Sequence, residues 1–280
     1  MFNKHFSGKL YFCGMKHTLF GTLIISSVLY MSCNGNNDTD AGNTAPQSNV
    51  ATLSYTVGNA FPHDTSHFTQ GLAFNGTELL EGTGNYGESK LLQLDLKTGK
   101  STKEVPLAKE YFGEGITILN DTVYQLTWKE NKVFVYAAGD FKKIKEFPIN
   151  TEGWGITHNG KELIVSDGSA NLYYYEPSTF RLLRTQGVTE DGSPAVNLNE
   201  LEFINGYVYA NQWQYNYILK IDPNSGQVVG KMDLSELHNR AKAKNPSADV
   251  LNGIAYNEQA KKLYVTGKNW PEIYELQINP

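Results

Sequence analysis

One carboxylate, Glu114, is placed where it could do chemistry. It lies between Gly113 and Gly115, behind two aromatic residues and at the start of an apolar segment. Glycines permit tight turns and leave the side chain between them unshielded. An acid in this setting is either a turn residue or a reactive group. The second interpretation gains weight because the segment recurs along the chain.

A second set of residues could share a site with Glu114. The residues that precede the first strand of each recurring segment are Gln70, Glu114, Trp154, Asn199 and Asn252. The residues that follow the second strand are Gly84, Trp128, Gly168, Trp213 and Lys268. In an antiparallel unit, the start of strand one and the end of strand two meet at the same rim.

That rim would carry an acid, a lysine, amides and tryptophans. Its positions differ from unit to unit while the strands around them stay alike, which favours a ligand site. The alternative is rim packing, with tryptophans as plugs and amides as turn caps.

The elements that must position these residues form five units. Each unit has an apolar strand, an Asn-containing turn, a second apolar strand, a loop and further strands. Turns such as Asn75-Gly76 and Asn205-Gly206 between apolar runs indicate hairpins. The units recur at intervals of about 40–50 residues, which is typical of a β-propeller.

The predicted fold is therefore all-β, a five-bladed β-propeller over residues 51–280. A content of 12% aromatic residues, with 17 Tyr and 26 Gly, favours short strands and tight turns. The spare strand at 51–57 is expected to complete the last blade and close the ring. Residues 235–243 are expected to form a short helix between blades four and five. A β-sandwich is the alternative, but it gives no reason for the repeat.

Composition excludes several classes of function. The net charge of −5 offers no basic patch for nucleic acid. The two cysteines, Cys13 and Cys33, both precede the repeats, so the folded part has no disulfide framework and no thiolate metal site. No HExxH motif or comparable histidine spacing occurs, so we expect no transition metal. A structural cation in the propeller channel remains an open alternative.

Residues 1–50 are not expected to belong to the fold. Residues 19–30 form an apolar run of signal-peptide length that ends shortly before Cys33. This arrangement resembles a bacterial lipobox, in which Cys33 is lipidated and becomes the mature N-terminus; an ordinary secretory signal is the alternative. Either Met1 or Met15 is the true start. Residues 1–33 are thus expected to be a signal peptide and 34–50 a flexible tether.

The repeated units also resemble a known family. The match covers roughly residues 55–278, and its motifs are together highly specific. It rests on the segments PHD (62–64), FTQGL (68–72), GTGNYG (82–87), YFGEG (111–115), WG (154–155), LNELE (198–202), ANQWQ (210–214), DVLNGIA (249–255) and VTGKNWP (265–271). They resemble the plant and bacterial glutaminyl cyclases, which are five-bladed propellers unrelated to the zinc-dependent animal enzymes. One departure is Glu81-Gly82, where the family more often has Glu-Ser, at a turn.

The resemblance implies an activity and a set of site residues. The family converts N-terminal glutamine to pyroglutamate and releases ammonia, so the implied partners are peptides or proteins with N-terminal Gln. The family's acid corresponds to Glu114, and its polar partners correspond to Gln70, Asn199 and Lys268. Its aromatic frame corresponds to Phe68, Phe112, Trp128, Trp154 and Trp213.

These residues suggest a mechanism that uses no cofactor. Glu114 would act first as general base and then as general acid. Lys268, Asn199 and Gln70 would stabilise the developing oxyanion. Glu200 and Glu202 either add acid to the site or hold their blade. We expect a monomeric lipoprotein of the bacterial envelope, in the periplasm or on the outer membrane, attached to the membrane only by its lipid.

Two other functions are open at this point. One is a non-catalytic propeller that binds a peptide or glycan at the same rim. The other is a metal-dependent lactonase, which needs several rim carboxylates; the two sets of rim positions supply only Glu114.

Overall fold

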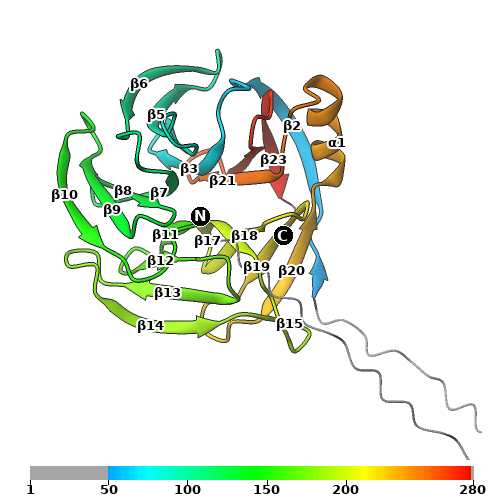
Figure 1. Cartoon of the computed structure of the whole chain (residues 1–280). Helices are drawn as coiled ribbons and strands as arrows, with labels where there is room; N and C mark the ends of the chain where they lie inside the picture. Colours follow the sequence, from blue (N-terminus) through cyan, green and yellow to red (C-terminus); the bar gives the residue numbers. More distant parts are fainter. Residues whose placement is uncertain (1–49, 279–280) are drawn as a thin grey trace, which may run out of the picture. The chain divides into compact units, whose positions relative to one another are not determined.

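The computed structural model describes residues 50–278. In this range the chain forms five antiparallel sheets that are the blades of a propeller (Figure 1). The predicted all-β, five-bladed fold is confirmed. Residues 50–278 contain no helix that is both long enough and apolar enough to cross a membrane. The predicted signal peptide, Cys33 and nearly all of the tether lie outside the described residues.

Each blade begins at the channel and proceeds outwards. Blade one holds β3 (Thr69–Asn75), β4 (Glu78–Thr83), β5 (Lys90–Asp95) and β6 (Lys100–Pro106). Blade two holds β7 (Gly113–Leu119), β8 (Thr122–Thr127), β9 (Lys132–Ala137) and β10 (Lys143–Pro148). Blade three holds β11 (Ile156–His158), β12 (Leu163–Val165), β13 (Asn171–Tyr175) and β14 (Leu182–Gly187).

The last two blades include strands from the start of the described chain. Blade four holds β17 (Leu198–Ile204), β18 (Tyr207–Gln212), β19 (Tyr217–Ile221), β20 (Val228–Asp233) and β1 (Ala51–Thr52). Blade five holds β21 (Leu251–Asn257), β22 (Lys262–Gly267), β23 (Glu272–Ile278) and β2 (Tyr55–Pro62). A small hairpin of β15 (Thr189–Glu190) and β16 (Ser193–Pro194) precedes blade four.

The ring closes through β2, which pairs antiparallel with β23. The prediction that 51–57 completes the last blade is correct from Tyr55 onwards and wrong for Ala51–Thr52, which pair in parallel with β20 of blade four. Leu53 explains why Ala51–Thr52 pair with blade four. Its N–H donates to the Lys231 carbonyl at 2.9 Å, and its side chain occupies the space that a side chain at Gly230 would fill. One segment therefore supplies the outermost strand of both blade four and blade five.

The innermost strands approach each other closely around the channel. The Gly115 N–H donates to the Trp154 carbonyl at 2.9 Å. A Cβ at Gly155 would lie 2.0 Å from the Asn199 carbonyl oxygen, a distance that no side chain tolerates. Glycine at this position is therefore required by the close backbone approach of neighbouring blades.

Apolar side chains fill the spaces between blades. The core between blades one and two includes Leu80, Leu91, Ile116 and Val123, each at most 1% exposed. Truncating such a residue to alanine typically costs about 2–5 kcal/mol. The rims are therefore carried by a packed, rigid frame.

The predicted helix is present as α1 (Ser235–Lys244), one residue longer than expected. The Asp233 carboxylate accepts the Ser235 N–H at 2.8 Å at its start, and Pro246 follows its end. Its buried residues, Leu237 and Ala241, belong to the same core as Trp270 of blade five. The helix thus covers the side of blades four and five (Figure 1).

Most predicted hairpin turns form where Asn precedes Gly or Asp. At 120–121 and 205–206 both turn residues have positive φ, as a type I′ turn requires. The turn expected at Asn257-Glu258 is instead a longer loop, in which the Asn257 side-chain oxygen accepts the N–H groups of Gln259 and Ala260.

Candidate active site

Register shifts at the start of the innermost strands aim the site residues. The pairing of β3 with β4 shifts between Thr69 and Gly71, and that of β7 with β8 shifts between Gly113 and Ile116. Blades four and five repeat the shift between Leu198 and Leu201 and between Leu251 and Ile254. Extra residues of this kind bend a strand and redirect a side chain. Gln70, Glu114, Asn199 and Asn252 lie in these irregular positions.

One cavity of about 350 Å³ collects the predicted residues. Its lining, here called the site cavity, consists of Phe68, Gln70, Asn85, Phe112, Glu114, Trp128, Trp154, Asn199, Trp213, Asp249 and Lys268. All nine residues predicted to act on the substrate are among them. The structure therefore brings together residues that are spread over 200 positions of the sequence.

Glu114 is the buried acid of the site cavity. It is only 4% exposed, and no group within residues 50–278 donates a hydrogen bond to its carboxylate. Burial raises the pKa of Glu114 well above its usual value; Lys268 opposes this shift, while Glu130 and Glu152 add to it. Desolvation thus outweighs the nearby cation, a balance that the sequence alone left undecided.

Lys268 is the buried cation of the site cavity. It is 6% exposed, and its Nζ lies 4.5 Å from the centre of the Phe68 ring. Burial lowers the pKa of Lys268, against the attraction of Glu114 and Asp249. No direct ion pair joins Lys268 to Glu114 within the described part of the chain, although both line the site cavity.

Gln70 and Asn199, two of the three amides that line the site cavity, have different surroundings. Asn252 donates to the Gln70 side-chain oxygen at 3.1 Å and to the Thr69 carbonyl at 3.0 Å. Since its oxygen is taken, Gln70 has its NH₂ group left for a ligand. Asn252 itself is fully buried and does not line the cavity, so its predicted place at the rim is wrong. Asn199 is 3% exposed, and among the described residues its side-chain oxygen has no partner.

Aromatic rings form much of the wall of the site cavity. One oxygen of Glu152 accepts both the Trp128 indole N–H at 2.8 Å and the Trp154 indole N–H at 3.0 Å. Trp154 packs edge-on against Trp213, with ring centres 5.6 Å apart. Phe112 contacts Trp128 at 5.5 Å in the same manner. Glu152 therefore fixes the orientation of two rings of the wall, those of Trp128 and Trp154.

The glycines of the second rim set support these rings. A Cβ at Gly84 would lie 2.5 Å from the Phe112 ring, and one at Gly168 would lie 2.7 Å from the Trp154 ring. Gly168 also has φ of +80°, which disfavours other residues. Both positions provide room for the wall, and neither contacts the cavity.

Glu200 and Glu202 hold blades together and do not line the site cavity. The Glu200 carboxylate accepts the N–H of Leu72 at 3.2 Å and of Ile254 at 2.8 Å, in blades one and five. Glu202 accepts the Tyr256 N–H at 2.9 Å. Burial raises the pKa of both and brings that of Glu202 to about 8. Of the two roles considered from the sequence, the structure supports the bracing one.

Three further residues of the site were not predicted. Asp249 is an exposed acid at the edge of the cavity, so Glu114 is not its sole carboxylate. Asn85 lines the cavity with φ of +81°. Asp249 and Asn85 lie within the segments that carried the family resemblance, which was the available signal. Glu152, two residues before Trp154, gave no signal in sequence.

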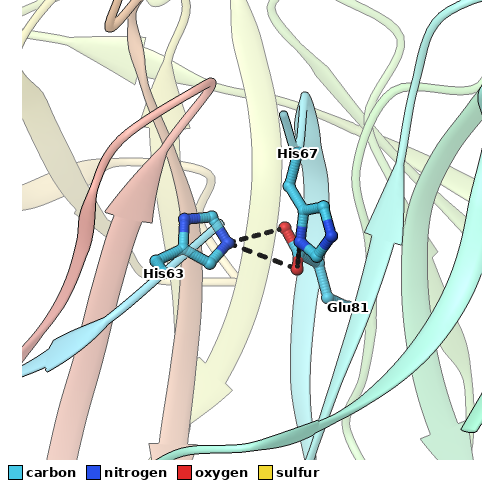
Figure 2. A group of neighbouring side chains, drawn as sticks. All are labelled: His63, His67 and Glu81. Atoms are coloured by element: carbon cyan, nitrogen blue, oxygen red, sulfur yellow. Dashed lines mark hydrogen bonds and ion pairs between the residues drawn. The ribbon is translucent and has the colours of Figure 1, made fainter. Parts of the chain in front are cut away.

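Candidate metal ligands also occur, contrary to the expectation from histidine spacing. His63, His67 and Glu81 bring one ligand atom each to within 4.8 Å of one another (Figure 2). The two histidines are four residues apart, so the sequence does contain a histidine spacing suited to a metal. This group lies beside the start of β3, and none of its members lines the site cavity.

Fold and cavity together define a β-propeller with an acid–base site inside an aromatic-walled pocket. Comparison with known proteins narrows this class. The family model described as glutamine cyclotransferase matches residues 25–278. The chain therefore belongs to the glutamine cyclotransferase family, as its motifs indicated.

Individual relatives agree with this family. A glutaminyl-peptide cyclotransferase of Arabidopsis thaliana is 40% identical over 221 residues, which are 78% of this chain and 69% of the relative. The crystal structure of Myxococcus xanthus glutaminyl cyclase matches with a TM-score of 0.78 and 34% identity, over 82% of this chain and 98% of that one. These similarities identify the chain as an enzyme.

Proposed function

We propose that this enzyme converts the N-terminal glutamine of peptides and proteins to pyroglutamate and releases ammonia. The observation that carries the proposal is a buried carboxylate, Glu114, that has no protein partner among the described residues and faces a small aromatic-walled cavity. The names of the two relatives support the same reaction. A cavity of about 350 Å³ suits a single residue and its amine.

In the proposed reaction Glu114 moves one proton. The substrate's α-amine, which reacts as the free base, attacks the carbonyl carbon of its own γ-carboxamide. Glu114 takes a proton from this nitrogen and delivers it to the departing amide nitrogen, which leaves as ammonia. One C–N bond forms and one breaks, and the carboxylate is regenerated. A raised pKa suits the first of these roles, because a carboxylate of higher pKa is the stronger base.

Fixed donors would stabilise the oxyanion on the γ-carbonyl oxygen. Lys268 and the free NH₂ group of Gln70 are the candidates, with Asn199 beside them. In a water-poor site such donors are worth more than in water, because they need no reorganisation as charge develops. The aromatic wall would fold the flexible glutamine side chain back on its amine and so hold the reacting atoms together.

An ammonia-release assay on a Gln-initiated peptide tests the proposal. The matched control is the same peptide with an acetylated N-terminus, whose amine cannot attack. We expect ammonia and a product 17 mass units lighter (about the mass of NH₃) from the first peptide alone. Tight binding of the free peptide without ammonia would instead favour the non-catalytic binding propeller.

We also propose that the chemistry needs no metal or cofactor. The site cavity offers a proton shuttle and oxyanion donors of its own, and the cluster of His63, His67 and Glu81 lies outside it. Activity that persists after chelation supports this, while a loss of activity that zinc restores without any change in melting temperature would contradict it. A lactonase with a metal at the rim would need Glu114 and Asp249 as ligands, and is tested by the same experiment.

Attachment to a membrane is proposed on the sequence alone. An apolar run of signal length precedes Cys33, and a polar stretch follows it. Lipidation of Cys33 would anchor the enzyme in the bacterial envelope, with the propeller in the periplasm or at the outer membrane. We propose that it acts there as a monomer, since one chain supplies every residue that lines the site cavity.

A further inference from the structure

The group of His63, His67 and Glu81 lies where blades one and five meet. His63 and His67 come from the loop between β2 and β3, and Glu81 from the middle of β4. The side chains of His63 and Glu81 are completely buried, whereas that of His67 is 14% exposed. Figure 2 shows both imidazoles directed at one carboxylate.

The hydrogen bonds of His63 show which of its ring nitrogens carries the proton, and they leave the other nitrogen, a hydrogen-bond acceptor, facing the Glu81 carboxylate oxygens, which also only accept. Its Nδ1 lies 2.8 Å from the Trp270 carbonyl oxygen, which can only accept, so the proton is on Nδ1. Nε2 of the neutral ring then presents its lone pair to both Glu81 oxygens, at 3.1 and 3.3 Å. Either a proton or a metal cation must therefore lie between these atoms.

Three features favour a metal cation in this position. His67 Nδ1 lies 2.8 Å from the second Glu81 oxygen and supplies another nitrogen. Two ligand atoms that each lie about 2.0–2.1 Å from a tetrahedral zinc are about 3.3 Å apart. His63 Nε2 lies 3.1 and 3.3 Å from the Glu81 oxygens, which fits this spacing, whereas the His67 contact is shorter. Outer hydrogen bonds hold both buried ligands, because Trp270 fixes the His63 ring and the Thr69 hydroxyl donates to Glu81 at 2.7 Å.

From this geometry we infer that His63 Nε2, His67 Nδ1 and a Glu81 oxygen form a binding site for a divalent transition metal such as Zn²⁺. Two imidazoles and one carboxylate are donors that zinc accepts, with water as the fourth ligand. The partly exposed His67 provides the route of entry. One ion would tie the loop after β2 to blade one where the ring closes.

The site would also support the active-site residues without taking part in the chemistry. Thr69 precedes Gln70, and its hydroxyl lies 3.4 Å from the Gly267 carbonyl beside Lys268. The His67 carbonyl accepts the Asn269 N–H at 2.8 Å. A bound ion would therefore rigidify both segments that carry polar groups into the site cavity.

Metal content and thermal stability of the full-length enzyme test the inference. The protein is stripped with a chelator, exposed to Zn²⁺, dialysed and measured for bound zinc; Mg²⁺ serves as the control ion. We expect one tightly bound zinc and a higher melting temperature with Zn²⁺ but not with Mg²⁺. Neither bound zinc nor melting temperature depends on catalysis, so a negative result here does not bear on the proposed cyclase reaction.

Variants separate this site from adventitious binding. His67→Ala removes a partly exposed ligand and should lose the tight zinc, while His158→Ala, in blade three, should keep it. Thr69→Val removes only the outer hydrogen bond and should weaken binding by about 10–100-fold. Any zinc that binds to Cys13 or Cys33 is the same in all variants, so it does not affect the comparison between them.

A second measurement guards against a variant that does not fold. Co²⁺ bound to the unmodified enzyme should give the intense visible absorption of a four-coordinate site, and Zn²⁺ should abolish it. If the stripped enzyme takes up no zinc, or if His67→Ala takes up as much as the unmodified enzyme, the inference is overturned. The three residues are then a proton-linked ion pair only.

Discussion

Replacing Glu114 by glutamine separates its chemical role from its structural one. The change keeps the shape of the side chain but removes its ability to take a proton. Because no described residue donates a hydrogen bond to the Glu114 carboxylate, the substitution breaks no hydrogen bond of the folded protein and removes only the attraction to Lys268. The fold should therefore be unaffected.

We expect Glu114→Gln to lower kcat strongly and to leave substrate binding almost unchanged. General acid–base groups typically contribute about 10²–10⁴-fold, so kcat should fall by that factor. This corresponds to about 2.7–5.5 kcal/mol of transition-state stabilisation. KM should change little, since the aromatic wall and the oxyanion donors that hold the substrate remain.

The same variant has a second signature, in stability. Burial raises the pKa of Glu114 above its unfolded value of 4.5, so the folded state binds more protons above that pH. The free energy of unfolding of the unmodified enzyme therefore falls as pH rises from 4.5 through the folded pKa. Glu114→Gln lacks this fall, which amounts to about 1.4 kcal/mol for each pH unit that separates the folded pKa from the unfolded one. The variant should be as stable at pH 4 and more stable at neutral pH.

Ammonia release from a Gln-initiated peptide and thermal melting across pH measure both effects. Glu202→Gln is the matched control: it is another buried acid with a raised pKa, but it lies outside the site cavity. Its amide oxygen can still accept the Tyr256 N–H, and its activity should be retained. Near-normal kcat in folded Glu114→Gln, or loss of activity in Glu202→Gln, would refute the assignment of the base.

Other variants test the neighbours of Glu114. Lys268→Met should lower kcat by about 10²–10³-fold, as loss of one oxyanion donor does, and should flatten the alkaline limb of the pH–rate profile, where a lysine of lowered pKa loses its proton. Glu152→Gln removes a negative charge that raises the pKa of Glu114, so the acid limb should move to lower pH; an unmoved limb contradicts the electrostatic coupling. Cys33→Ser should release the enzyme from the membrane fraction, and a variant that stays there would contradict lipidation.

The sequence determined the fold through its periodicity. Five units with the same order of strands and Asn-containing turns need a ring, because each unit buries its apolar faces only against its neighbours. Seven of the nine site residues were also found this way, since equivalent positions of a repeat share one rim; Phe68 and Phe112 came only from the family resemblance. Where the repeat was interrupted the prediction failed: β1 pairs with blade four, and the loop at Asn257 is longer than a two-residue turn.

Other properties of the site depend on contacts between blades, which no repeat encodes. The pKa of Glu114 is set by burial against the opposing charge of Lys268, two residues on different blades. Glu152 orients two tryptophans, and Glu200 reaches backbone amides of two other blades, although neither pattern is visible in the chain. His63 and Glu81 meet only because β2 closes the ring beside blade one. Sequence periodicity specified which residues share a rim, whereas desolvation, hydrogen-bond partners and convergent ligand atoms arise only when the ring is closed.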